Sequence, residues 1–171
     1  MFGLTTHSDT HALELLKRDH AEVDGMFKQY EDAVEAGDIA LKSALAAGIC
    51  DALTIHATLE EENFYPAVRR RDAKTRDLVN EAAVEHQSLK DIIGRLQSTT
   101  PADSLYDAGV KVLAEYVKHH VKEEENQLFP MVSKTDLDLE KLGAAMQVRK
   151  TQLQSRPYRV PVRAATRRRA A

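Results

Sequence analysis

Apolar residues recur along most of this chain at alternating steps of three and four, the period of an α-helix that buries one face. Four such stretches occur, over about residues 10–36, 39–65, 75–98 and 101–132. In each stretch, one position of the buried seam is occupied by a histidine: His20, His56, His86 and His120. The pattern predicts an all-α fold in which each of four helices turns one imidazole inward.

The connections between these stretches predict how the helices follow one another. Gly37 is a helix-stop residue and Asp38 an N-cap, so the first two helices are expected to be antiparallel neighbours. Pro66 marks a bend or an end of the second helix. Thr100 is expected to cap the fourth helix, with Pro101 as its first residue. Together these signals favour an up-down-up-down four-helix bundle over residues 10–133.

The same connections place the four histidines at similar depths. About 16 residues follow His20 to the end of its helix, and His56 lies about 18 residues into the next, so at ~1.5 Å per residue the two are roughly level. The later turns are looser but compatible with the same arrangement. The four imidazoles are therefore expected to form one layer inside the bundle.

A short motif containing histidine and glutamate occurs twice. His56 is followed four residues later by Glu60, and His120 by Glu124; each copy ends in an aromatic residue and a proline. A spacing of four places both side chains on one helix face, where an imidazole and a carboxylate make half of a metal site. Two copies suggest a pair of metal ions held by His20, His56, Glu60, His86, His120 and Glu124.

Composition limits the kind of metal site. The 171-residue chain contains a single cysteine, Cys50, so a thiolate cluster or an internal disulfide is excluded. Imidazoles with carboxylates suit iron, manganese or zinc. Four imidazoles and two carboxylates do not fill two octahedral shells, which leaves positions for oxide, hydroxide or a small ligand. This predicts a reactive site.

These residues resemble the hemerythrin-like, HHE cation-binding family, over about residues 10–133. The family pattern has a histidine on the first helix, a His-x-x-x-Glu near a proline on the second, a histidine on the third and a further His-x-x-x-Glu on the fourth. The resemblance implies two iron ions, bridged by oxide or hydroxide and by the carboxylates, with histidines in terminal positions. Members bind dioxygen, sense oxygen, iron or nitric oxide, repair iron–sulfur clusters, or consume peroxide.

The chain departs from the oxygen carriers of that family. They have a second histidine four residues after the first on the third helix, where this chain has Lys90, and they use Asp at i+5 rather than Glu124 on the fourth helix. These differences favour the broader HHE group over reversible oxygen carriage. The missing ligand could be replaced by water or by one of Glu61, Glu85 and Tyr116.

Several other residues of suitable chemistry are assigned structural roles. His119 is expected in the second shell or on the surface, and His7 and His11 are expected to face solvent. Glu61, Glu62, Glu123 and Glu125 are interpreted mainly as an acidic, hydrated face. Core packing is the simplest role for the aromatic residues Tyr30, Tyr65, Tyr106 and Phe129, and Cys50 is expected to be a small apolar filler.

The chain beyond the bundle has two parts. Over 135–154 an apolar pattern predicts an accessory helix capped by Thr135 or Asp136, whose apolar face packs either on the bundle or on a second copy in a homodimer. The segment 155–171 carries six arginines and no acidic residue. It reads either as a solvated tail, which we favour, or as an arm for nucleic acid or another acidic partner. We do not expect nucleic acid as a partner.

Two classes of function remain open at this point. One is an enzyme that turns over hydrogen peroxide or reactive nitrogen species in a catalase-like cycle. The other is a binding or sensing protein for dioxygen, nitric oxide or iron, in which ligand occupancy changes stability. No secretory signal is visible and nowhere do roughly 18 apolar residues run together, so we expect a cytoplasmic protein with no membrane partner. The net charge of −3 is too small to name a partner.

Overall fold

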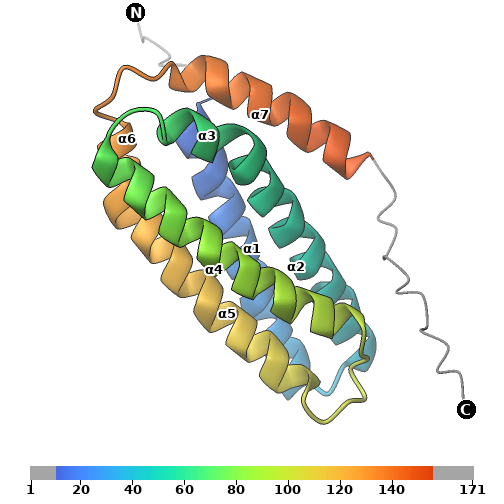
Figure 1. The fold of residues 1–171 in the computed structure, drawn as a ribbon. Coiled ribbons are helices and arrows are strands. Elements are labelled where there is room, and N and C mark those ends of the chain that lie inside the picture. The colour runs from blue at the N-terminus through green and yellow to red at the C-terminus, as the bar shows by residue number, and fades with distance from the viewer. Residues whose placement is uncertain (1–10, 156–171) are drawn as a thin grey trace, which may run out of the picture.

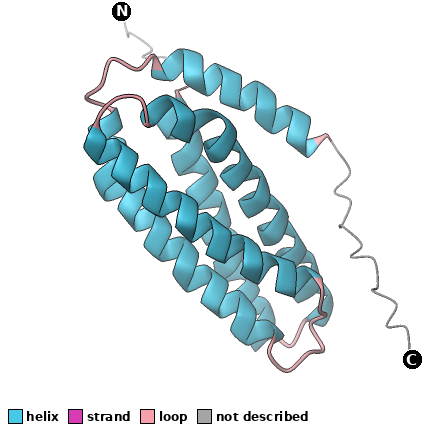
Figure 2. Ribbon diagram, viewed as in Figure 1, coloured by secondary structure: helices cyan, strands magenta, loops and turns pink. Residues whose placement is uncertain are grey.

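The structure is a computed structural model that describes residues 11–155, and His7 and nearly all of the arginine-rich segment lie outside the described residues. Within that range every regular element is a helix, which confirms the all-α prediction (Figure 2). The helices are α1 (Ala12–Glu35), α2 (Ile39–Leu59), α3 (Tyr65–Val68), α4 (Ala73–Gln97), α5 (Tyr106–Glu123), α6 (Phe129–Val132) and α7 (Leu139–Gln154).

The long helices α1, α2, α4 and α5 run up and down as a bundle, and the short α3 and α6 extend α2 and α5 (Figure 1). Helix α7 crosses the upper end of the bundle and packs against α1 and α2. Its apolar face is therefore used within the chain, where Met146 is fully buried.

The bundle core is divided by the histidine layer. One apolar cluster contains Leu16 and Leu128 and lies toward α3, α6 and α7. The second contains Val23 and Leu113 and lies toward the opposite end. Along each of the four long helices the histidine falls between residues of the two clusters, so the imidazoles sit in the middle of the bundle with apolar packing above and below.

The turn signals were correct in part. Gly37 adopts a positive φ of 68°, and the Asp38 carboxylate accepts a hydrogen bond from the Leu41 backbone N–H, as expected of a stop and an N-cap. The predicted start of the fourth helix, at Pro101 with Thr100 as its cap, was wrong. Residues 101–105 form turns and α5 starts at Tyr106, because the Asp103 side chain accepts from the Leu105 N–H and closes a local turn there.

Three further boundaries differ from the expectation. Asp72, assigned to a solvated connection, caps α4 and moves its start to Ala73. Asp138 caps α7, in place of Thr135 or Asp136. Pro66 does not end its helix: it lies in the first turn of α3, which follows a π-helical turn and continues to Val68.

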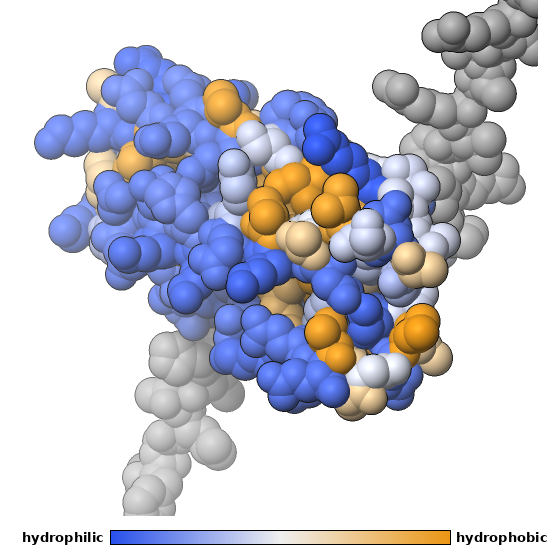
Figure 3. Space-filling view, turned by 90° about the horizontal axis from the view of Figure 1, so that it is seen from below, coloured by the Kyte–Doolittle hydropathy of each residue, from blue (hydrophilic) through white to orange (hydrophobic). Residues whose placement is uncertain are grey.

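The stretch 39–68 is long and apolar enough, by length and composition alone, to cross a membrane, a test that the core helix of a bundle also meets. In the fold it forms the second helix of the bundle and carries His56 and Glu60 into the interior. Length and composition do not by themselves distinguish such a core helix from a membrane span. At the lower end of the bundle, apolar side chains, among them Ile39 and Leu105 beside the two loops, are exposed (Figure 3).

Candidate metal centre

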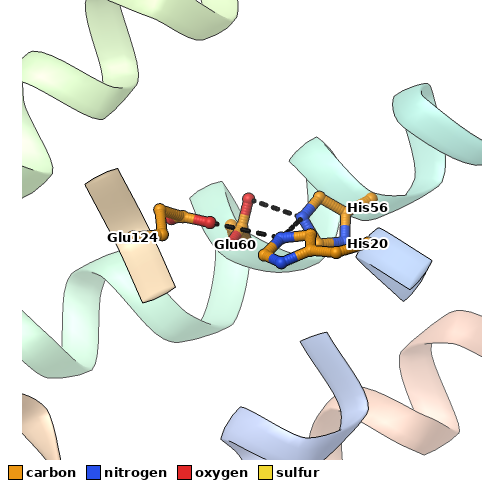
Figure 4. A group of neighbouring side chains, drawn as sticks. All are labelled: His20, His56, Glu60 and Glu124. Carbon is orange, nitrogen blue, oxygen red and sulfur yellow. Dashed lines mark hydrogen bonds and ion pairs between the residues drawn. The ribbon is translucent and has the colours of Figure 1, made fainter. Parts of the chain in front are cut away.

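The structure brings all six predicted ligand residues together in the centre of the bundle. None of their side chains is more than slightly exposed, and Glu60 is fully buried. They come from four helices: His20 from α1, His56 and Glu60 from the second helix, His86 from α4, and His120 and Glu124 from the helix that contains α5. Figure 4 shows four of them, with His20 and His56 on one side of the two carboxylates.

The four imidazoles form two matched pairs. The Nε2 atoms of His20 and His56 lie 3.1 Å apart, and so do those of His86 and His120. The ring centroids are 4.7 Å apart in both pairs. The bundle thus presents two nitrogen half-sites of the same geometry.

Each glutamate lies between the two pairs. One oxygen of Glu60, Oε2, is 3.2 Å from Nε2 of His56 and 3.3 Å from Nε2 of His86. The corresponding oxygen of Glu124 is 3.4 Å from Nε2 of His20 and 3.6 Å from Nε2 of His120. Each carboxylate therefore reaches one imidazole of each pair, which is the arrangement required of a bridge between two ions.

The outer nitrogens of the imidazoles are held by acidic residues. Nδ1 of His20 lies 2.8 Å from Glu125, Nδ1 of His86 lies 3.0 Å from Glu61, and Nδ1 of His120 lies 2.7 Å from Glu85. For His56 the partner is Asp19, at an ion-pair distance of 3.6 Å. This distance is too long for a hydrogen bond. The contacts of His20, His86 and His120 are typical of metal-bound histidines, which commonly donate their second ring N–H to a carboxylate.

These contacts show that the residues fit metal ions. An ionised carboxylate only accepts hydrogen bonds, so the proton of each neutral imidazole so held resides on Nδ1 and its Nε2 presents a lone pair. In their neutral forms His86 and His120, both of which are held at Nδ1, then turn two lone pairs toward each other at 3.1 Å. Glu60 Oε1 and Glu124 Oε2 are moreover buried without a hydrogen-bond partner. A cation in each half-site would satisfy both the lone pairs and the oxygens.

The electrostatics of the centre favour positive charge. Burial by itself would lower the pKa of His56, but Glu60 and Asp19, with Glu124, raise it to about 10. Burial by itself would also lower the pKa of His120, but Glu124 and Glu85 raise it above its ordinary value. Burial would raise the pKa of Glu60, but His56 and His86 hold it well below its ordinary value. The carboxylates that retain a proton on the imidazoles would equally stabilise a metal cation.

A π-helical turn follows each of the two glutamates of the centre. The two turns span Glu60–Phe64 and Glu124–Leu128, so each begins at the glutamate itself. In each, the N–H of the aromatic residue before the proline donates to the carbonyl of that glutamate, five residues back. A proline cannot donate a backbone hydrogen bond, and the wider turn lets the helix continue through it. Such turns are frequent at functional sites.

Tyr65 is a site residue that sequence reasoning missed, because it was assigned to core packing. Its hydroxyl donates to Glu124 Oε1 at 3.0 Å and lies 3.4 Å from Glu60 Oε2 and 3.3 Å from His86 Nε2. The same position in the second motif copy is Phe129, whose ring stacks on His20 at 5.9 Å. Comparing the two copies would have flagged Tyr65 as the polar member of an otherwise apolar pair.

Other candidates take second-layer or surface positions. Lys90, where oxygen carriers have a histidine, pairs with the Glu61 carboxylate at 2.6 Å. Of the candidates for the missing ligand, Glu61 and Glu85 are engaged with imidazole Nδ1 atoms, and the Tyr116 side chain is half exposed. The predicted hydrated acidic face is thus partly an orienting layer. His11 does not face solvent as expected, since its Nδ1 is buried.

A small cavity of about 30 Å³ adjoins the four imidazoles. Lys90 is one of the charged residues in its lining. The rest of the wall is mostly apolar and includes Val23, Leu53, Ala57, Leu89, Ile93, Val117 and Val121. A cavity of this size has room for only a very small molecule.

Comparisons with known proteins agree with this geometry. Residues 11–132 match the family described as the hemerythrin HHE cation binding domain. A crystal structure of a hemerythrin HHE cation binding domain-containing protein from Mycobacterium kansasii superposes with a TM-score of 0.70 at 26% sequence identity, covering 84% of this chain and 87% of that one. The chain therefore belongs to the hemerythrin HHE cation-binding family, and the groups of His and Glu at its centre are able to hold metal ions.

A second relative is much longer than this chain. The protein named DNA nickase from Nostoc sp. (strain PCC 7120) is 26% identical over 126 residues, which cover 72% of this chain and 34% of the relative. The chain spans about a third of that protein.

Proposed function

We propose that this protein holds two iron ions in the centre of its bundle and reacts there with small oxidants, hydrogen peroxide foremost. The observation that carries the proposal is the arrangement of Glu60 and Glu124, each within reach of one imidazole from both histidine pairs. Imidazole and carboxylate ligands without a thiolate suit iron. Iron bound there would supply reversible electron transfer to and from peroxide, which no side chain of the site can provide.

The ligand count supports reaction in preference to reversible oxygen carriage. Two imidazoles and two shared carboxylates per ion leave coordination positions for an external molecule, and Lys90 cannot act as a further nitrogen ligand because its ammonium is paired with Glu61. The cavity beside the imidazoles limits that molecule to the size of peroxide, dioxygen or nitric oxide.

Tyr65 provides a proton donor at the same place. Burial, together with Glu60 and Glu124, raises the pKa of the Tyr65 phenol well above its ordinary value, so the hydroxyl remains protonated. It lies within hydrogen-bond distance of Glu124 and faces His86. We assign to it the donation of a hydrogen bond to a bound oxidant in the disproportionation of peroxide, in which two peroxides give one dioxygen and two waters.

The compartment in which this chemistry would take place is also a proposal. The single cysteine, Cys50, is buried and free, which fits a reducing compartment such as the cytoplasm. In that setting the protein would contribute to defence against oxidative stress.

The test starts with the purified protein from iron-supplied cells. Iron is counted per chain, hydrogen peroxide is added, and dioxygen release is followed with an electrode. Two irons per chain and repeated dioxygen evolution are expected, and both should be lost in His56→Ala but retained in Glu115→Ala, an exposed position on α5. Two irons without turnover would refute the peroxide reaction and leave a binding or sensing protein. Absence of iron would refute the metal assignment.

A further inference from the structure

A second group of metal-ligating side chains lies on the outside of the bundle. Nε2 of His119 is 3.4 Å from Oε1 of Glu85 and 3.7 Å from Oε1 of Glu123. One ligand atom of each residue lies within 4.8 Å of the others. The His119 side chain is 64% exposed, so these three residues, the outer trio, are open to solvent.

The outer trio connects directly to the buried centre. While one oxygen of Glu85 faces His119, the other is 2.7 Å from Nδ1 of His120. A small pocket of about 10 Å³ lies beside this contact, and Glu85 and Glu123 line it together with His120 and Glu124. Leu78, Ala82 and Leu128 complete its walls.

Glu124, one of the residues that line this pocket, has an unsatisfied oxygen. Glu124 is only 2% exposed, and its Oε2 has no hydrogen-bond partner. A buried carboxylate oxygen without a partner is costly, and a cation that arrives along the pocket would satisfy it.

The opposite half of the bundle shows that the outer trio is not needed to build the centre. The two motif copies align His56 with His120, so the positions of His119 and Glu123 correspond to Ile55 and Leu59. Leu59 is fully buried and both residues pack in the apolar cluster that α7 covers. Asp19, the counterpart of Glu85, is paired with Lys150 of α7. Among the described residues, an outer group of potential metal ligands is therefore found at the half that α7 leaves open, while Ile55 and Leu59 occupy the corresponding positions of the other half.

We infer that Glu85, His119 and Glu123 form an uptake site, at which a divalent transition-metal ion binds transiently before it moves along the pocket to Glu124 and His120. The inference rests on the proposed function, since it requires that the inner centre holds metal. One imidazole and two carboxylates are suitable ligands for ferrous iron and its neighbours. An exposed three-residue site binds weakly, and transfer requires a site that an ion can leave.

The test measures how fast the inner centre fills, separately from how much metal it holds. The full chain is stripped of metal, cobalt(II) alone is added at low concentration, and the visible absorption of bound cobalt is followed by stopped flow. The variant H119N/E123Q keeps Glu85, which is needed to hold His120. E31Q removes the same formal charge at an exposed position of α1 far from the trio and is the matched control.

We expect filling of H119N/E123Q to be slower by about tenfold or more, the lower range of electrostatic focusing on association rates. Its final stoichiometry and spectrum should equal those of the wild type, and E31Q should fill at the wild-type rate. An unchanged rate in the double variant would overturn the inference, as would equal slowing in E31Q, which would indicate general surface charge. If wild-type protein fails to take up cobalt at its centre, the proposed function itself is refuted. E123Q alone should show part of the slowing and serves if the double variant does not fold.

Discussion

Replacement of Glu124 by alanine tests the bridging geometry most directly. The carboxylate reaches His20 of one pair and His120 of the other, at 3.4 and 3.6 Å. A single substitution therefore removes a ligand from both half-sites at once. A terminal ligand would affect only one of them.

The expected magnitude follows from linkage between metal binding and folding. Loss of even a supporting partner weakens metal binding by about 10–100-fold, and we take ~100-fold for this ligand. At a free metal concentration of ~1,000 times the wild-type Kd, bound metal contributes about 4.1 kcal/mol to the free energy of unfolding, and after the substitution about 1.4 kcal/mol. These values are for one ion. Because the substitution weakens both sites, the total loss is about 5.4 kcal/mol, and the metal-induced rise in Tm should shrink by roughly 10–20 °C for a chain of this size.

The assay compares thermal unfolding of the metal-free and metal-loaded forms of each protein by circular dichroism. Using the difference between the two forms removes any direct effect of the substitution on packing. Glu115→Ala, on the exposed side of the same helix, is the control and should retain the full metal-induced rise. If Glu124→Ala binds two ions per chain and shows the wild-type rise in Tm, Glu124 is not a shared ligand and the interpretation of the centre is wrong.

Three further predictions follow from the neighbouring residues. Tyr65→Phe should retain both metals but slow dioxygen release from peroxide, because it deletes only the hydroxyl; an unchanged rate would remove Tyr65 from the chemistry. Lys90→His should shift the optical spectrum of the oxidised protein toward that of an oxygen carrier, whereas Lys90→Gln, which also breaks the pair with Glu61, should not. In the metal-free protein, burial lowers but Glu60 and Asp19 raise the pKa of His56 to about 10, above its ordinary 6.5. Its charge therefore stabilises the fold below the ordinary pKa, and this stability is lost as pH rises through the raised one. Urea unfolding of metal-free protein should accordingly show a decline between about pH 7 and pH 10, and metal-loaded protein, whose imidazoles are already neutral ligands, should show little.

Some roles of charged residues could not be predicted from the sequence, because they depend on contacts between different helices. Glu61 was interpreted as part of a hydrated face and Lys90 as a lost ligand, yet the two form an ion pair and Glu61 also holds His86. Asp19 and Glu85 directly precede His20 and His86. Only Glu85 was considered as a possible ligand in the sequence analysis. Each orients the histidine of a different helix, so no spacing within one helix reveals the contact.

Helical periodicity by itself determined the four seams, the four histidines on them and the two His-x-x-x-Glu half-sites, because side chains three and four residues apart share a face whatever the helix packs against. Only the tertiary structure decided which imidazoles pair, that Glu60 and Glu124 each span both pairs, and that Tyr65 reaches the centre. Those contacts depend on the rotation and register of one helix against another, and Tyr65 reaches the centre from just beyond the π-helical turn that begins at Glu60. The start of α5, by contrast, depends on a local contact. The Asp103 side chain accepts a hydrogen bond from the Leu105 N–H, and the helix begins after this turn instead of at the predicted cap, Thr100.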